Sequence, residues 1–109
     1  MSKGFRVNRL TTINEEWGEE PDDFCVQLHC ELTSDDPGGE AFVVTVLSPV
    51  ALAKGLDGPK AVDWGRGCLF MNDYSAPAIE AELQRFVDGS GADTWDALSQ
   101  HVGKFFDWI

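Results

Sequence analysis

The residues that could bind a metal ion or act as a nucleophile are few in this chain. Its 109 residues include three cysteines and two histidines. Cys25 and Cys30 lie in one alternating segment at opposite parity, so they are expected on opposite faces of a strand. Cys25 and His29 share a face but lie about 13 Å apart at roughly 3.3 Å per residue. The cysteines are therefore predicted to be reduced and structural, and no metal site is predicted.

The other catalytic patterns are incomplete. His101 is expected on the exposed face of the last helix, and no nucleophile-elbow pattern precedes any serine. Gly65, Arg66 and Gly67 resemble a fragment of a phosphate-binding loop but lack its Gly-Lys-Ser/Thr continuation. Carboxylates are abundant, but they cluster in turns, whereas raising a carboxyl pKa requires burial. The sequence thus predicts no enzyme activity and no cofactor.

Acidic residues dominate the first half of the chain. The formal net charge is −11, and positions 10–53 hold ten acidic residues and no lysine or arginine. The rest of the chain holds nine acidic residues against eight basic ones. Nucleic acid and anionic membranes are poor partners for this surface, because phosphate binding depends on lysine and arginine. A basic protein partner is favoured. The simpler interpretation is an acidic protein whose charge only prevents aggregation.

Positions 14–23 form the candidate contact segment. It contains six acidic residues, Gly18 and Pro21, and its apolar residues follow neither a strand nor a helix periodicity. A loop is therefore predicted. A second acidic turn, at positions 35–36, lies roughly 25–30 Å away along the intervening strand. Trp17 could pack back onto the core or anchor a partner. The predicted partner-binding residues are Glu15, Glu16, Trp17, Glu19, Glu20, Asp22 and Asp23, with Asp35 and Asp36 secondary.

Three predicted strands position this segment. Residues 5–13 alternate loosely, which predicts an edge strand. Residues 24–32 alternate strictly, as is typical of a strand with one face on the core. Residues 38–49 are rich in β-branched side chains and are bounded by glycines and Pro49, which predicts a central strand buried on both faces. The Pro-Gly-Gly sequence within residues 33–39 predicts that the second and third strands form a hairpin.

The second half of the chain is predicted to supply the helices. Residues 50–56 could form a short helix, and residues 68–71 a fourth strand. Ser75, followed by an alanine and a proline, predicts a helix start, and Gly89-Ser-Gly its end. Asp93 or Thr94 caps the last helix. The apolar stripes are Ile79, Leu83, Phe86 and Val87 on the first of these helices and Trp95, Leu98, Val102 and Phe105 or Phe106 on the second.

The predicted fold class is α+β, in a single domain spanning residues 1–109. It is a mainly antiparallel sheet of about four strands with the two C-terminal helices packed on one face. No apolar run approaches the roughly 18 residues that a membrane span needs. The N-terminal residues lack the apolar core of a secretory signal. A cytoplasmic protein is therefore expected.

Four stretches of the sequence also match a known pattern. They are Glu-Pro-Asp-Asp-Phe at 20–24, Gly-Glu-Ala-Phe at 39–42 with Val-Leu-Ser-Pro at 46–49, Asp-Thr-Trp-Asp-Ala-Leu at 93–98, and Phe-Phe-Asp-Trp at 105–108. In this order and spacing, the chain resembles the immunity protein 8 family, small proteins encoded beside the toxins of bacterial polymorphic toxin systems. The resemblance implies a non-enzymatic antitoxin that binds a cognate toxin by stoichiometric occlusion.

Three functions are thus open from the sequence. The first is an immunity protein that neutralises a basic bacterial toxin such as a nuclease, which agrees with the acidic half of the chain. The second is a small cytoplasmic enzyme or ligand-binding domain with a cleft between sheet and helices. The third is a structural subunit of a larger assembly. The sequence favours no particular oligomeric state.

Overall fold

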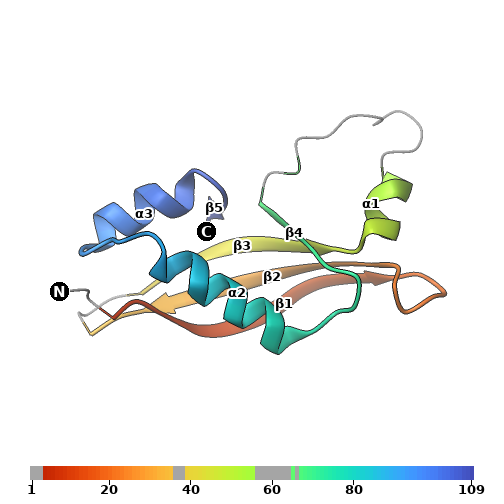
Figure 1. The fold of residues 1–109 in the computed structure, drawn as a ribbon, viewed down its shortest axis with the longest axis horizontal. Helices are drawn as coiled ribbons and strands as arrows, with labels where there is room; N and C mark the ends of the chain where they lie inside the picture. Colours follow the sequence, from red (N-terminus) through yellow and green to blue (C-terminus); the bar gives the residue numbers. More distant parts are fainter. Residues whose placement is uncertain (1–3, 36–38, 56–64, 66) are drawn as a thin grey trace.

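The computed structural model describes residues 4–35, 39–55, 65 and 67–109. One open sheet with the strand order β1-β2-β3-β4 forms the body of the molecule, and α2 and α3 pack against it (Figure 1). The short strand β5 pairs with β3. This α+β architecture confirms the predicted fold class. The elements are β1 Arg6–Trp17, β2 Phe24–Thr33, β3 Gly39–Leu47, α1 Pro49–Gly55, β4 Cys68–Phe70, α2 Ala76–Asp88, α3 Trp95–Gly103 and β5 Asp107–Trp108.

The β2–β3 pair supplies the centre of the core. Both strands alternate, and in the antiparallel register Val26 lies opposite Val46 and Leu28 opposite Val44. Side chains of matching parity therefore point to the same face and bury one continuous apolar layer beneath the helices. The predicted pairing of these strands is confirmed, although part of the predicted turn, with Asp36, lies outside the described residues. The buried strand residues are Phe24, Val26, Leu28, Cys30, Leu32, Phe42, Val44 and Val46.

The prediction that β3 is buried on both faces is wrong in part. Its core face is fully buried, but Val43, Thr45 and Leu47 on the opposite face are only half-buried. The apolar composition of β3 reflects its central position between β2, β4 and β5, where neighbouring strands shield its edges. The sequence of a central strand can thus be apolar at nearly every position even when helices cover only one face of the sheet.

The first strand is longer than predicted. Residues 14–17 were expected in a loop, but β1 continues through them, with Glu15 opposite Val26 and Trp17 opposite Phe24. The ladder with β2 outweighs the weak strand preference of these residues, because strand formation depends on the partner strand as much as on local composition. Only residues 18–23 form the connection to β2.

The two long helices begin and pack largely as predicted. Ser75 Oγ accepts a hydrogen bond from Ala78 N at the start of α2, and Thr94 Oγ1 accepts one from Ala97 N at the start of α3. Their stripes bury Ile79, Leu83, Val87, Leu98 and Val102. His101 was expected to be exposed, but it is half-buried, with its ring stacked on Phe86 at a centroid distance of 4.7 Å. No helix in the described part of the chain is long and apolar enough to cross a membrane.

The shorter elements complete the sheet. α1 spans Pro49–Gly55, close to the predicted short helix, whose last residue lies outside the described part. The predicted fourth strand forms as β4 and runs parallel to β3. No sequence pattern predicted β5, whose two residues pair with Phe42 and Val43. The Trp108 indole N–H donates to the Ser99 carbonyl at 3.0 Å, which ties this end of the chain to α3.

Candidate functional site

The acidic tip, residues 15–23, comprises the end of β1 and the connection to β2. Glu15 and Glu16 are neighbours in β1 and so point to opposite faces of the sheet. The connection is closed by hydrogen bonds from Gly18 N to the Asp23 carbonyl at 2.8 Å and from Asp23 N to the Glu20 carbonyl at 3.1 Å. All of the predicted acidic residues here except Asp23 are exposed: Glu15, Glu16, Glu19, Glu20 and Asp22.

Asp23 has a structural position within the tip. Its residue surface is 8% exposed, and its carboxylate is paired with Lys54 of α1. A Cβ at Gly18 would collide with the Asp23 carboxylate, so this close approach requires glycine. Asp23 was predicted to be a partner-binding residue, but in the structure it ties the tip to α1. Lys54 was not singled out, although it is the first basic residue after the acidic stretch 10–53.

Ser48 joins α1 to the base of the tip. Its fully buried Oγ accepts hydrogen bonds from Phe24 N at 3.2 Å and from Ala51 N at 3.1 Å. The first bond satisfies a main-chain donor at the start of β2, and the second caps α1. Ser48 N also donates to the Phe24 carbonyl at 3.1 Å. The same residue therefore fixes α1, and through it Lys54, relative to the acidic tip.

Trp17 combines the two roles considered for it. One side of the indole packs on Phe24 and Tyr74, with ring centroids at 5.1 and 5.8 Å, and its N–H donates to Glu15 Oε1 at 3.2 Å. The residue is nevertheless 46% exposed. A tryptophan held on one side by aromatic rings presents a rigid apolar surface on the other, which suits a contact residue.

A cleft of about 520 Å³ lies beside the acidic tip. Its walls include Glu16, Trp17, Cys25, Leu47 and Leu52. The apolar residues can contact the aliphatic stem of a long side chain while carboxylates at the rim pair with its cationic end. This combination is suited to an arginine or lysine of a partner.

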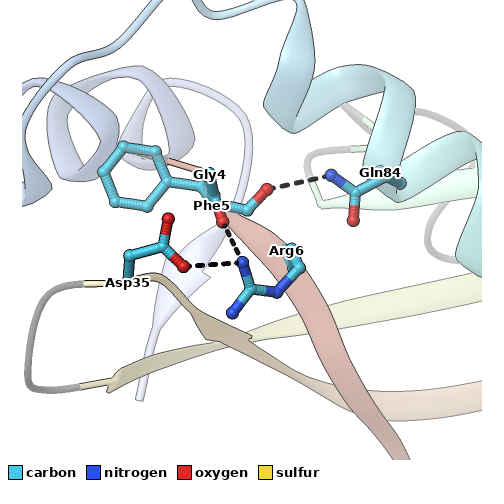
Figure 2. A network of polar contacts seen from close by, with 5 residues as sticks. All are labelled: Gly4, Phe5, Arg6, Asp35 and Gln84. Carbon is cyan, nitrogen blue, oxygen red and sulfur yellow. Dashed lines mark hydrogen bonds and ion pairs between the residues drawn. The ribbon is translucent and has the colours of Figure 1, made fainter. Parts of the chain in front are cut away.

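The second predicted cluster lies apart from the tip. Asp35 follows the far end of β2, the strand whose first residue adjoins the tip. Its carboxylate pairs with Arg6 Nη1 at 3.2 Å, and the same nitrogen donates to the Gly4 carbonyl at 2.9 Å (Figure 2). Asp36 lies outside the described residues. The two predicted clusters therefore do not form one site.

A larger cleft of about 730 Å³ lies between β4 and the two long helices. Phe86, Phe105 and Phe106 contribute apolar walls, and Arg85 and Lys104 contribute positive charge. This is the location that the sequence suggested for a ligand-binding cleft, but its basic residues were not anticipated. Nothing in the local sequence pattern could have shown that residues of α2 and the end of α3 converge there with the start of β4.

Two of the cysteine thiols have raised pKa values. No group of three or more histidine, cysteine, aspartate or glutamate side chains in that part of the chain is placed to hold a metal ion. Burial, with the nearby charges of Glu80 and Glu31, raises the pKa of Cys30 to about 12. Burial and the charge of Glu16 also raise the pKa of Cys25. Both thiols therefore stay protonated at neutral pH, when thiolate is the nucleophilic form.

Comparison with family models gives a match over residues 3–109 to immunity protein 8. This match covers essentially the whole chain, including every element from β1 to β5. The chain belongs to the immunity protein 8 family. Comparison with curated proteins and with solved structures gave no match. Membership of the immunity protein 8 family confirms the predicted resemblance and assigns the general role of an immunity protein, whose partner is a toxin.

Proposed function

We propose that this member of the immunity protein 8 family neutralises a basic toxin by docking on its acidic tip. The observation that carries the proposal is the gathering of five exposed carboxylates on residues 15–22 at one end of the sheet. The tip lies within the stretch 10–53, which contains no lysine or arginine. The protein would act without catalysis, by occluding the toxin in the cytoplasm, and neither nucleic acid nor membrane would be its target.

Three features of the tip support this role. A dense negative field accelerates association with a basic protein and opposes association with acidic ones. The half-exposed Trp17 offers an apolar and cation-binding surface beside the carboxylates. The Asp23–Lys54 pair and the two closing hydrogen bonds hold the connection in one shape before binding, which reduces the entropy lost in the complex.

The test is a binding measurement with the toxin domain encoded by the neighbouring gene, carried out in rising salt. The test variant converts Glu15, Glu16, Glu19 and Glu20 to glutamine. The matched control converts four exposed acidic residues elsewhere to their amides: Glu40, Asp73, Glu80 and Asp93. Both variants change the net charge by the same amount.

We expect the association rate of the wild type to fall as salt rises, because exposed charges are screened over roughly 10 Å at 0.1 M salt. The tip variant should associate at least tenfold more slowly at low salt and lose most of the salt dependence. The control variant should lose much less. Association that is indifferent to salt, or equal losses in the two variants, would contradict docking on the acidic tip.

The cleft between β4 and the two long helices supports the alternative function, a small ligand-binding domain. Its volume of about 730 Å³ is in the range of small-molecule sites, and its aromatic walls with Arg85 and Lys104 suit an aromatic anion. Indole-3-acetate is a suitable probe. A saturable shift of the His101 NMR signals, abolished by Phe86→Ala, would support this alternative, and unchanged spectra would count against it.

A further inference from the structure

The outer edge of β1 has no strand beside it in the described part of the chain. β1 is the first strand in the sheet order and is twelve residues long, and ten of these residues pair with β2. Residues 11–17 are all exposed, and they contain neither proline nor lysine. Thr11, Thr12 and Ile13 favour strand structure. Natural proteins usually shield an edge of this length, because its main-chain groups can pair with another chain.

One side chain does shield the beginning of this edge. The Gln84 side-chain amide accepts a hydrogen bond from Val7 N at 2.8 Å and donates one to the Phe5 carbonyl at 3.0 Å. Figure 2 shows the second of these bonds, with Gln84 reaching from α2 to the start of β1. The side-chain amide thus replaces one peptide group of a neighbouring strand. This side-chain cap ends at Val7, and no comparable cap is seen beyond it among the described contacts. The ladder with β2 does shift register between Val7 and Arg9 and between Thr12 and Asn14, so the free edge is irregular at these two places.

The ladder indicates which main-chain groups face outward beyond Val7. In an antiparallel pair, residues that exchange hydrogen bonds with the partner alternate with residues whose N–H and C=O point away from it. Val7 is of the second kind, because its N–H bonds Gln84. Leu10, Thr12 and Glu15 lie opposite Cys30, Leu28 and Val26, the alternate residues of β2 that follow the partner of Val7. Their N–H groups are therefore expected at the free edge.

Charge along the edge selects what could pair there. At one end Arg9 is already paired with Glu31 at 3.4 Å. At the other end the exposed Glu15 and Glu16 have no basic neighbour on β2, where they face Val26 and Cys25. An added strand with lysine or arginine beside them would gain opposite-charge cross-strand pairs. A second copy of this chain would instead approach with the same whole-chain net charge of −11, which opposes its association.

We propose that a basic segment of the toxin adds as a strand to β1 along residues 9–17, next to the acidic tip. This inference rests on the proposed function and specifies how the partner binds. Main-chain hydrogen bonds to Leu10, Thr12 and Glu15 give affinity, and the carboxylates select a basic strand. The half-exposed Trp17 contacts the same segment where it leaves the edge.

The test uses the wild-type protein with the toxin domain encoded by the neighbouring gene. Amide hydrogen exchange is followed by NMR in the free protein and in the complex. The amides of Leu10, Thr12 and Glu15 should exchange at least tenfold more slowly in the complex. A second arm compares Thr12→Pro, which removes the outward N–H, with Thr12→Ala, which retains it. The proline variant should bind at least tenfold more weakly, and the alanine variant within about threefold of wild type.

The outcomes separate this inference from the proposed function. A complex in which these three amides exchange as fast as in the free protein overturns strand addition and leaves docking on the tip intact. Failure of the wild type to bind the toxin overturns both. A dimer of the free protein, shown by sedimentation and lost in Thr12→Pro, assigns the edge to a second copy and overturns the proposal. If Thr12→Pro does not fold, the exchange measurement on the wild type decides.

Discussion

Replacing Ser48 by alanine is expected to destabilise the protein by about 2–4 kcal/mol. The Ser48 side chain is fully buried and accepts two main-chain hydrogen bonds, from Phe24 N and from Ala51 N. Alanine removes both acceptors but keeps the Ser48 main-chain bond to the Phe24 carbonyl. The Phe24 N–H then stays buried without its partner, and α1 loses its cap.

The magnitude is the sum of two effects. Leaving a buried main-chain donor unsatisfied costs about 1–3 kcal/mol. Losing a helix N-cap costs about 0.5–2 kcal/mol, with about 1 kcal/mol typical. Because 1 kcal/mol shifts the melting temperature of a domain of this size by roughly 4–8 °C, the expected loss is on the order of 10–30 °C.

The assay is urea unfolding followed by tryptophan fluorescence, together with thermal unfolding by circular dichroism. Ser75→Ala is the matched control. Ser75 Oγ also caps a helix, accepting from Ala78 N at 3.3 Å, but it serves no buried strand donor. Its loss should cost only about 1 kcal/mol. If Ser48→Ala is no more destabilising than Ser75→Ala, the argument that Ser48 satisfies a buried donor of β2 is refuted.

Three further predictions concern buried side chains and their exposed controls. Cys30 should react with iodoacetamide at pH 8.5 much more slowly than Cys25. Burial and nearby charge raise the pKa of both thiols, but that of Cys30 reaches about 12 and its thiol is buried, whereas Cys25 is half-buried; equal labelling by mass spectrometry would contradict this. The raised pKa belongs to the folded state, so the contribution of the Cys30 thiol to the free energy of unfolding is complete below about pH 8.5 and is lost as pH rises toward 12. Cys30→Ala should therefore flatten the pH dependence of urea unfolding between these two pH values. Leu98→Ala, at a fully buried site, should cost about 2–5 kcal/mol, whereas Ile13→Ala, at a 45% exposed edge position, should cost less than about 1 kcal/mol in the same unfolding assay.

The candidate site was only partly predictable from the sequence. The acidic composition of residues 14–23 located the tip, because exposed charge does not depend on which residues pack together. The position of Asp23 did depend on packing. Its burial and its pairing with Lys54 follow from the way α1 folds back beside β2, 31 positions along the chain from Asp23. The half-buried setting of Trp17 likewise depends on Tyr74, which precedes α2.

Local patterns sufficed for the elements whose neighbours lie close in sequence. Strict alternation defined β2, and the serine and threonine caps defined the starts of α2 and α3, since each pattern reports the geometry of its own segment. The pairing of β2 with β3 also followed, because a short turn leaves few other arrangements. Acidic character and membership of an immunity family were equally within reach of the sequence.

The tertiary structure decided what depends on distant partners. It extended β1 to Trp17 because β2 offers a ladder of matching length, and it added β5 because β3 has a free edge at Phe42 and Val43. It also stacked His101 on Phe86, where α2 and α3 meet. A segment whose sequence shows no hydrophobic periodicity takes its conformation from the strand or helix packed against it. The sequence thus determined the charge and the local periodicity of this protein, and the packing of distant segments determined which charges and which strand edge are left for a partner.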